Sequence, residues 1–198
     1  MFKKLFVSKS LLIRQMASGE NKTALQAVET LKSKGWFRDG TLHRAQLVQA
    51  NLQGAALAKA DLLGANLQRA NLTRAYLGDT HLRGADLQEA VLCDANMRNV
   101  ILLEANLARA DLSRAYLPVA QLKGAVFTSA CLIEANLWQA DLSGANLTGC
   151  QMRGVLLYET RFDEATILPD GSRWSAEVDV SRFIDPAHPN FWSDNGRA

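Results

Sequence analysis

The sequence has few cysteines, few histidines and no long apolar run. No stretch is long and apolar enough to cross a bilayer as a helix, so we expect no membrane span. The 198 residues include three cysteines and three histidines, which is sparse for a disulfide-stapled fold or a clustered metal centre. Three free thiols are typical of a reducing compartment, so we expect a cytoplasmic protein.

The sequence also lacks a strong excess of charge of either sign. The whole chain has a formal net charge of +2, and residues 41–167 hold 11 basic and 12 acidic side chains. A protein that binds nucleic acid directly usually carries a continuous basic stripe, and this sequence shows none. We therefore expect no direct nucleic-acid binding.

What the sequence does contain is a strict period of five residues. Leucine or a large apolar replacement occupies every fifth position from Leu42 to Ile167, which makes 26 pentads, and alanine usually stands two positions earlier. Residues five apart would be rotated by about 140° on an α-helix and would point to opposite faces of a flat strand. Neither element would bury the leucines together, whereas a chain that turns a corner once per pentad would bury all of them. The period therefore predicts an all-β solenoid.

Four pentads would complete one square coil, so that residues 20 apart stack ~4.8 Å apart and pair as in a parallel sheet. In 11 pentads the residue between the two inner positions is Asn or Asp, whose side chain bonds nearby backbone in turns. The pattern predicts a close-packed core with large apolar centres. The centres other than leucine are Met97, Phe127, Met152, Phe162 and Ile167.

The repeats Ala60-Asp61-Leu62-Leu63-Gly64 and Ala135-Asn136-Leu137-Trp138-Gln139 resemble those of the pentapeptide-repeat family. The resemblance covers the pentads, or two thirds of the chain. It implies a right-handed quadrilateral parallel β-helix, in agreement with the solenoid argued from the period. The segment 166–172, with residues 182–186 and 191–192, is similar to the C-terminal tail of many bacterial members, notably cyanobacterial ones. The roles of most members are unknown, so the resemblance implies little about function.

The N-terminal flank is expected to cover the first coil, since the end of a solenoid exposes apolar side chains. Residues 21–39 are predicted to form a helical cap that begins at Asn21 or Thr23 and ends at Gly35. Residues 1–20 are predicted to form a basic extension, either amphipathic or disordered.

A secretory signal is the weaker interpretation of this extension. Lys9 and Arg14 interrupt its apolar stretch, and no cleavage site is evident. Met16, followed by Ala-Ser-Gly, also reads as a translation start. Three interpretations of residues 1–15 therefore stay open. They are a native part of the protein, a targeting arm, or an upstream extension of a gene that starts at Met16.

The C-terminal flank is expected to cover the last coil. Residues 40–168 are predicted to form the pentapeptide-repeat β-helix, and residues 169–198 an irregular capping tail that starts at a turn. Because the tail would cover the coil edge, we expect a monomer. The tail residues that can lie over the edge are Trp174, Phe183, Phe191 and Trp192.

Charge also bears on the choice between partners. The resemblance brings in one known role, since some family members protect DNA gyrase or another type II topoisomerase by resembling DNA. That role requires a strongly negative rod that competes with DNA for a phosphate-binding groove, so the near-neutral charge of this solenoid disfavours it. Stacking by 20 instead predicts ion pairs within two columns of alternating sign. The columns are Arg74, Asp94, Arg114 and Glu134, and Arg69, Glu89 and Arg109.

One predicted face of the solenoid, that of Leu57, Leu77 and Leu117, carries outward aromatic residues. Exposed aromatic side chains along one face can mark a partner site, and the alternative is that they cover one another or a flank. We predict that this face binds a protein partner, whose identity the sequence leaves open. Its outward residues are Tyr76, Tyr116, Trp138 and Tyr158, with Val119 and Leu156.

We predict no catalytic residue, no cofactor site and no metal site. His43 and His81 would lie two coils apart, about 10 Å, which is too far to share one ion. Cys93 and Cys131 would also lie two coils apart and Cys150 fills an inner site, so no disulfide is expected. A convex rod offers no cleft for acid–base chemistry. The sequence favours a non-enzymatic, rigid interaction or scaffold module; the alternatives are a topoisomerase-protecting DNA mimic and a structural rod without a dedicated ligand.

Overall fold

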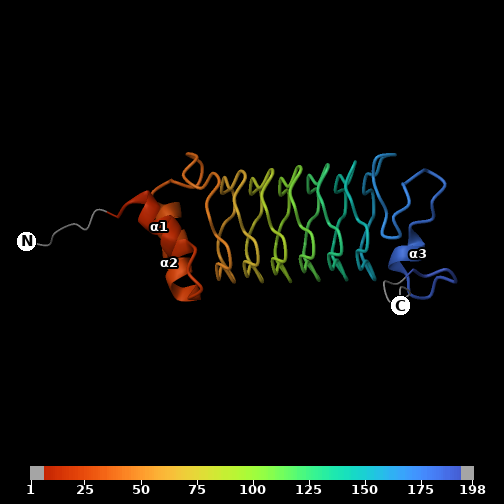
Figure 1. The fold of residues 1–198 in the computed structure, drawn as a ribbon, viewed down its shortest axis with the longest axis horizontal. Helices are drawn as coiled ribbons and strands as arrows, with labels where there is room; N and C mark the ends of the chain where they lie inside the picture. The colour runs from red at the N-terminus through yellow and green to blue at the C-terminus, as the bar shows by residue number, and fades with distance from the viewer. Residues whose placement is uncertain (1–6, 193–198) are drawn as a thin grey trace, which may run out of the picture.

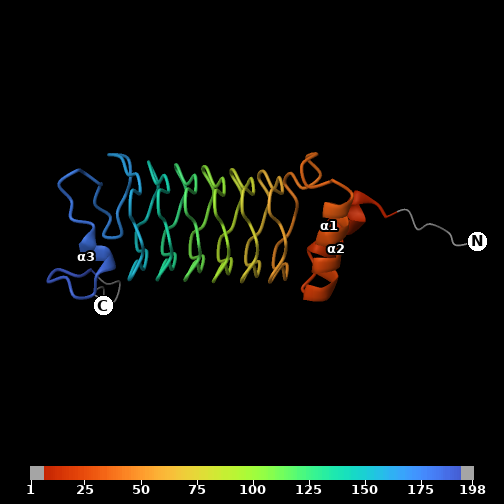
Figure 2. The ribbon, with the colours of Figure 1, turned by 180° about the vertical axis from the view of Figure 1, so that it is seen from behind.

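The computed structural model describes residues 7–192, which form a rod with helices at one end and an irregular tail at the other (Figure 1). Helices α1 (Lys9–Met16) and α2 (Asn21–Ser33) lie against the first coils, and α3 (Ser181–Ile184) lies beyond the last coil (Figure 2). Between them the coils follow one another along the long axis. Within the described range no helix is both long enough and apolar enough to cross a membrane.

Each coil contains four pentads, because successive β-bridges join residues 20 apart. The bridges are parallel and run from Gln46–Asn66 to Asp141–Arg161. The predicted parallel solenoid of pentads is confirmed. Its strands are shorter than the all-β class suggests. Each face of a coil contributes a bridge of a single residue, and the described residues contain no strand longer than that.

A tight turn after every bridge explains why the strands stay so short. In each pentad from Leu42 to Leu157 the N–H of the next inner small residue donates to the central residue's C=O, as Ala110 does to Leu107 at 3.0 Å. The residue before that donor has positive φ at all 24 turns from Arg44 to Glu159, which is the signature of a type II turn. Only seven of these 24 residues are glycine, so the turn geometry is imposed largely by the ladder and not by glycine.

The Asn and Asp residues between the inner positions stabilise these turns, as predicted. In all 11 pentads the side-chain oxygen accepts from the N–H two residues ahead, for example Asn71 from Thr73 at 3.0 Å. The carbonyl or carboxylate thus binds a donor that would otherwise face solvent. The 11 residues are Asn51, Asp61, Asn66, Asn71, Asp86, Asn96, Asn106, Asp111, Asn136, Asp141 and Asn146.

The core consists of the central residues and the small inner residues, and nearly all of them are fully buried. Polar replacements at the small positions keep a hydrogen bond. Thr80 Oγ1 donates to the C=O of Leu57 at 3.0 Å, and Thr160 Oγ1 donates to that of Leu137 at 2.8 Å. Burial of these hydroxyls is therefore compensated by a backbone acceptor one coil below.

The five-residue period breaks once, so the prediction that Ile167 is a core centre is wrong. One extra residue, Asp163, shifts the register: Ile167 forms the bridge to Asn146, and Leu168 becomes the buried centre. The carboxylate of Asp163 accepts from Gly144 N–H at 2.8 Å, in place of a C=O of the regular ladder. Hydrogen bonds, chiefly from Gly144 N–H, lower the pKa of Asp163.

The N-terminal cap differs in two respects from the expectation. Residues 9–16 form α1 and pack on α2, so this part of the extension is helical, while residues 1–6 lie outside the described residues. The N-cap of α2 is Glu20 and not Asn21 or Thr23, because Asn21 Nδ2 instead donates to the C=O of Asn51 at 3.1 Å. This bond ties α2 to the first coil.

The C-terminal end of α2 follows the expectation. Gly35 has φ 72°, its N–H donates to Lys32 C=O at 2.9 Å, and the N–H of Trp36 donates to Leu31 C=O at 3.0 Å. This is a Schellman motif, which needs a positive φ at the glycine. The connecting segments then close the first edge of the ladder, since Asp61 N–H donates to Phe37 C=O at 2.7 Å.

Candidate functional site

The predicted aromatic face exposes large apolar side chains to solvent. The bridges place Tyr76, Asn96, Tyr116, Asn136 and Leu156 in one row along the rod, each one coil from the next. Trp138 and Tyr158 lie in a parallel row, two positions further along their pentads. The aromatic residues of this face, with Val119 and Leu156, are between 40% and 69% exposed.

The structure brings most of these residues together and leaves Tyr76 apart. Asn96 separates Tyr76 from Tyr116 along the row, a distance of two coils or ~10 Å. The others lie on three successive coils at the C-terminal end of the face. We call this group the C-terminal apolar patch; it consists of Tyr116, Val119, Trp138, Leu156 and Tyr158.

These side chains do not cover one another by ring stacking. Among the described residues the close aromatic pairs lie in the tail region, namely Phe162 with Trp174 and Phe183 with Trp192. The high exposure of Tyr158 and Leu156, at 69% and 57%, also leaves little room for cover by a flank. The patch is an apolar surface in contact with water.

Val119 is held in an unfavourable backbone conformation within the patch. Its φ is 59°, and it is the one β-branched residue among the 24 positive-φ turn positions. Left-handed φ is strongly disfavoured for β-branched side chains and costs roughly 1–2 kcal/mol for residues other than glycine. Residue types alone do not predict this strain, because the positive φ follows only from the turn type.

A polar groove borders the patch at the neighbouring corner of the rod. It is lined by Val119, Gln121, Gln139, Asp141, Glu159 and Arg161, together with Ala120. The amide of Gln139 donates to the Glu159 carboxylate at 2.6 Å, one coil ahead. An apolar area edged by polar side chains is the usual composition of a protein-binding surface.

The charged columns form the predicted ion pairs except at Glu134, which makes none with the other described residues. Glu89 lies 2.8 Å from Arg69 and 3.9 Å from Arg109, while Asp94 lies 2.8 Å from Arg114 and 4.0 Å from Arg74. The hydrogen bond from Arg114 lowers the pKa of Asp94. These exposed side chains neutralise one another within the column, which leaves no charged stripe there.

The two histidines on the first coils are joined by a carboxylate that sequence reasoning missed. Asp61 accepts from His43 at 2.7 Å and lies 3.3 Å from His81 Nδ1. Burial raises the pKa of Asp61, but hydrogen bonds from His43 and from Leu63 N–H outweigh it and lower the pKa. In residues 7–192 no three His, Cys, Asp or Glu side chains are grouped so as to hold a metal ion.

The thiols are poorly suited to nucleophilic chemistry. Cys93 Sγ donates to the Asp111 carboxylate at 3.0 Å, and burial, with this bond, raises the pKa of the thiol to about 12. Burial likewise raises the pKa of Cys150 to about 12. Both groups therefore stay protonated near neutral pH, and all three cysteines are free thiols.

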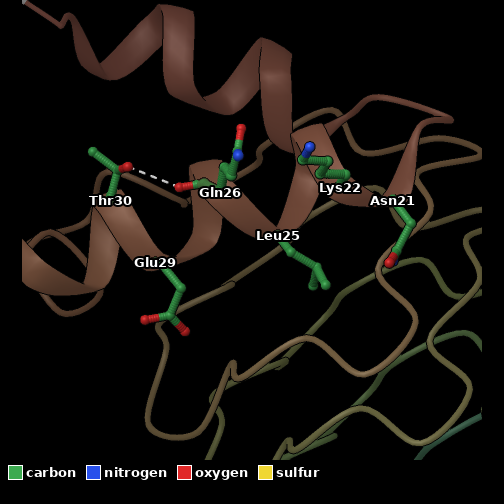
Figure 3. A pocket seen from close by; sticks show the side chains of 6 residues that line it. All are labelled: Asn21, Lys22, Leu25, Gln26, Glu29 and Thr30. Carbon is green, nitrogen blue, oxygen red and sulfur yellow. Dashed lines mark hydrogen bonds between the residues drawn. The ribbon is translucent and has the colours of Figure 1, made fainter.

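A hollow on α2 is lined by one helix alone. Figure 3 shows its six side chains, all from α2, with the hydrogen bond of 2.7 Å from Thr30 Oγ1 to Gln26 C=O. Asn21, at one end, is occupied in holding the helix to the first coil. The lining residues come from one helix, and no second element faces them across the hollow. The hollow therefore does not enclose a ligand.

The pentads match a known family of repeats. A family model of pentapeptide repeats matches residues 45–84, 75–114 and 120–157, in eight copies. A search of curated proteins gives no match.

Among solved structures, the chain is similar to HetL, a pentapeptide repeat protein involved in heterocyst differentiation regulation from the cyanobacterium Nostoc sp. strain PCC 7120. The two are 31% identical over 67% of this chain and 76% of HetL, with a TM-score of 0.40. A second pentapeptide repeat protein of that Nostoc strain is 32% identical over 50% of this chain and 82% of its own, with a TM-score of 0.42.

QnrB1, a plasmid-mediated fluoroquinolone resistance protein, is 16% identical over 62% of this chain and 83% of its own, with a TM-score of 0.43. The family model itself spans more than half of the residues, in register with the pentads seen in the structure. The chain belongs to the pentapeptide-repeat family.

Proposed function

We propose that this chain is a non-enzymatic, right-handed quadrilateral rod that binds a protein partner through its C-terminal apolar patch. It would act as a rigid interaction or scaffold module, as a monomer in the cytoplasm. The observation that carries the proposal is the patch itself: five exposed apolar side chains on three successive coils of one face. Contiguous aromatic and aliphatic side chains with a polar rim typically form the centre of a protein interface.

A rigid scaffold makes such a patch effective. The ladder fixes the backbone of every coil by hydrogen bonds of about 2.7 to 3.2 Å, so the patch needs little ordering when a partner binds. Tyr116, Trp138 and Tyr158 also lose few rotamers on binding, because each has only two side-chain torsions.

The strain at Val119 supports a role outside folding. At 41% exposure its side chain gains little from burial, while its backbone conformation disfavours valine. A residue that lowers stability without a folding benefit is commonly retained for function.

We expect Val119→Asn to stabilise the protein by about 1 kcal/mol, because Asn tolerates positive φ better than valine. Thermal melting would measure the gain, and partner binding should weaken in the same variant. Ser129→Asn, at the same pentad position on the opposite face, is the matched control and should change stability by less than about 0.5 kcal/mol. A destabilised Val119→Asn protein would show that valine is favoured there by folding.

The charge distribution supports a protein partner over the DNA-mimic alternative. In each of the two columns basic and acidic side chains alternate, and all but Glu134 pair, so the rod does not present the strongly negative surface that a phosphate-binding groove would attract. A gyrase supercoiling assay with a quinolone would separate the two functions, and we expect no protection at stoichiometric protein.

The patch can be tested with a double variant and a control on the same face. Tyr116→Ser with Trp138→Ser should melt within about 0.5 kcal/mol of the parent, since both side chains lie outside the core. Affinity capture from the native host should then lose the partner that the parent retains. Tyr76→Ser, in the same row but two coils away, should retain it. Equal retention by the double variant and the parent would refute the patch as the binding surface.

A further inference from the structure

The last coil leaves the patch face with an open ladder edge. Within the rod, three hydrogen bonds join neighbouring coils on this face: Leu137 N–H to Leu156 C=O, Gln139 N–H to Tyr158 C=O, and Leu156 N–H to Ala135 C=O, at 2.9, 2.9 and 3.0 Å. One coil later the equivalent groups are the N–H of Leu157, the N–H of Glu159 and the C=O of Val155. None of the three has a hydrogen-bond partner among residues 7–192.

The tail contacts the other three sides of the rod end. Arg173 forms an antiparallel bridge with Ile167 on one side, and Gly154 N–H donates to Ile184 C=O at 2.8 Å on the next. On a third side Trp174 stacks on Phe162, with ring centroids 6.1 Å apart. The backbone on the Phe162 side is also unpaired, since Phe162 N–H and Thr160 C=O have no backbone partner among residues 7–192, but Trp174 covers that edge. On the patch side the described tail neither pairs with the last pentad nor stacks on it.

Burial of the central residues shows the same gap. Leu157 is only partly buried, as is Phe162, but Phe162 stacks on Trp174 whereas Leu157 lies between Leu156 and Tyr158 of the apolar patch. The earlier centres on this face are all fully buried, namely Leu57, Leu77, Met97, Leu117 and Leu137. An unpaired row of backbone groups beside exposed apolar side chains is a template for one more strand.

We propose that an extended segment of a partner protein pairs with this edge as an added parallel strand. The proposal rests on the proposed function and deepens it by stating what the partner presents. The first residue of the segment would donate its N–H to Val155 C=O and accept from Leu157 N–H. Its third residue would accept from Glu159 N–H, which continues the ladder by one coil.

The register also sets the side chains of the segment. The second residue would point onto Leu157, in the position that a large apolar centre holds in every coil below, so it must be large and apolar. The first and third residues would lie beside Leu156 and Tyr158 on the outer surface, which favours apolar or aromatic side chains there. Proline is excluded at the first position, because that residue must donate its N–H to Val155 C=O and proline has no N–H.

The shape of the rod end favours a single strand over a second copy of the chain. The tail, with α3, lies beyond the last coil in both views (Figures 1 and 2), so another rod cannot stack end to end on the coil. A segment three residues wide needs only the free side. The site therefore suits an extended peptide stretch and not the blunt end of a solenoid.

Random linear peptides selected on the immobilised full chain provide the probes for a test. Selected peptides should share one large apolar residue flanked by apolar or aromatic ones. On binding, amide hydrogen exchange should slow at least 10-fold at Leu157 and Glu159. N-methylation of the peptide residue before the shared apolar one should weaken binding at least 10-fold, whereas N-methylation of the apolar residue itself should have little effect.

Protein variants give the matching controls. Leu156→Lys with Tyr158→Lys places charges on both sides of the edge and should abolish peptide binding with unchanged melting, while Tyr76→Lys should not. Protection at other amides, or insensitivity to N-methylation, would overturn the added strand. Slow amide exchange at Leu157 and Glu159 in the free chain would also overturn the proposal. Such protection would depend on protein concentration if a second copy covered the edge, and it would disappear on removal of residues 193–198 if these residues covered it. The peptide tests at the edge can fail while the variant Tyr116→Ser with Trp138→Ser still loses the native partner. In that case the proposed function stands and only the proposal of an added strand is wrong.

Discussion

Replacing Leu107 with alanine is expected to lower the free energy of unfolding by about 2 to 5 kcal/mol. Leu107 is fully buried in the middle of the rod, with coils on both sides, so the missing atoms leave a cavity that neighbours cannot fill. Denaturant unfolding followed by circular dichroism measures the loss. Leu156→Ala is the control, because Leu156 is 57% exposed and its truncation should change stability little. Equal losses would mean that the central residues do not form the core.

Deleting residues 169–198 is expected to convert a monomer into dimers or aggregates. The deletion removes Trp174 from Phe162 and Ile184 from the edge at Gly154, and it leaves Leu168 without the strand that covers it. All four sides of the rod end would then present unpaired backbone beside apolar centres, which promotes edge-to-edge association.

Light scattering with size-exclusion chromatography decides this prediction. The full chain should elute as a monomer, and the truncated chain should be larger or insoluble. A truncated chain that stays monomeric and equally stable would show that the tail does not protect the edge. A full-length dimer would show that the tail does not suffice to cover it.

Most of the solenoid could be predicted because its period is read directly from the residue types. Leucine and alanine at fixed spacing identify the inward positions, and residues 20 apart then pair, so that ion pairs such as Arg114 with Asp94 follow from simple counting. The Asx turns follow in the same way, since Asn and Asp between inner positions have a backbone donor two residues ahead.

The irregular features could not be predicted, because each depends on a contact outside the repeat. Asp163 adds one residue, but Ile167 and Leu168 are both apolar, so the sequence hides the register shift. Glu20 replaces Asn21 as the N-cap because the Asn21 side chain binds the first coil, at Asn51, 30 residues further along the sequence. The free edge at Leu157 depends on where the tail runs, which composition does not specify.

The candidate site was predicted in part. Outward aromatic positions on one face follow from the pentad numbering, and their exposure agrees with that placement. The clustering of Tyr116, Trp138 and Tyr158 apart from Tyr76 depends on how the coils stack, and the strain at Val119 depends on the turn type. Binding of a protein at this face can be measured in living cells.

Site-specific photo-crosslinking in the native host tests the binding face most directly. Trp138→p-benzoylphenylalanine keeps an aromatic side chain in the patch, and Thr128→p-benzoylphenylalanine occupies the same pentad position on the opposite face. Illumination should give a discrete adduct with one protein from position 138 and none from position 128. The same adducts from both positions, or an adduct from position 128 alone, would contradict the patch as the binding surface.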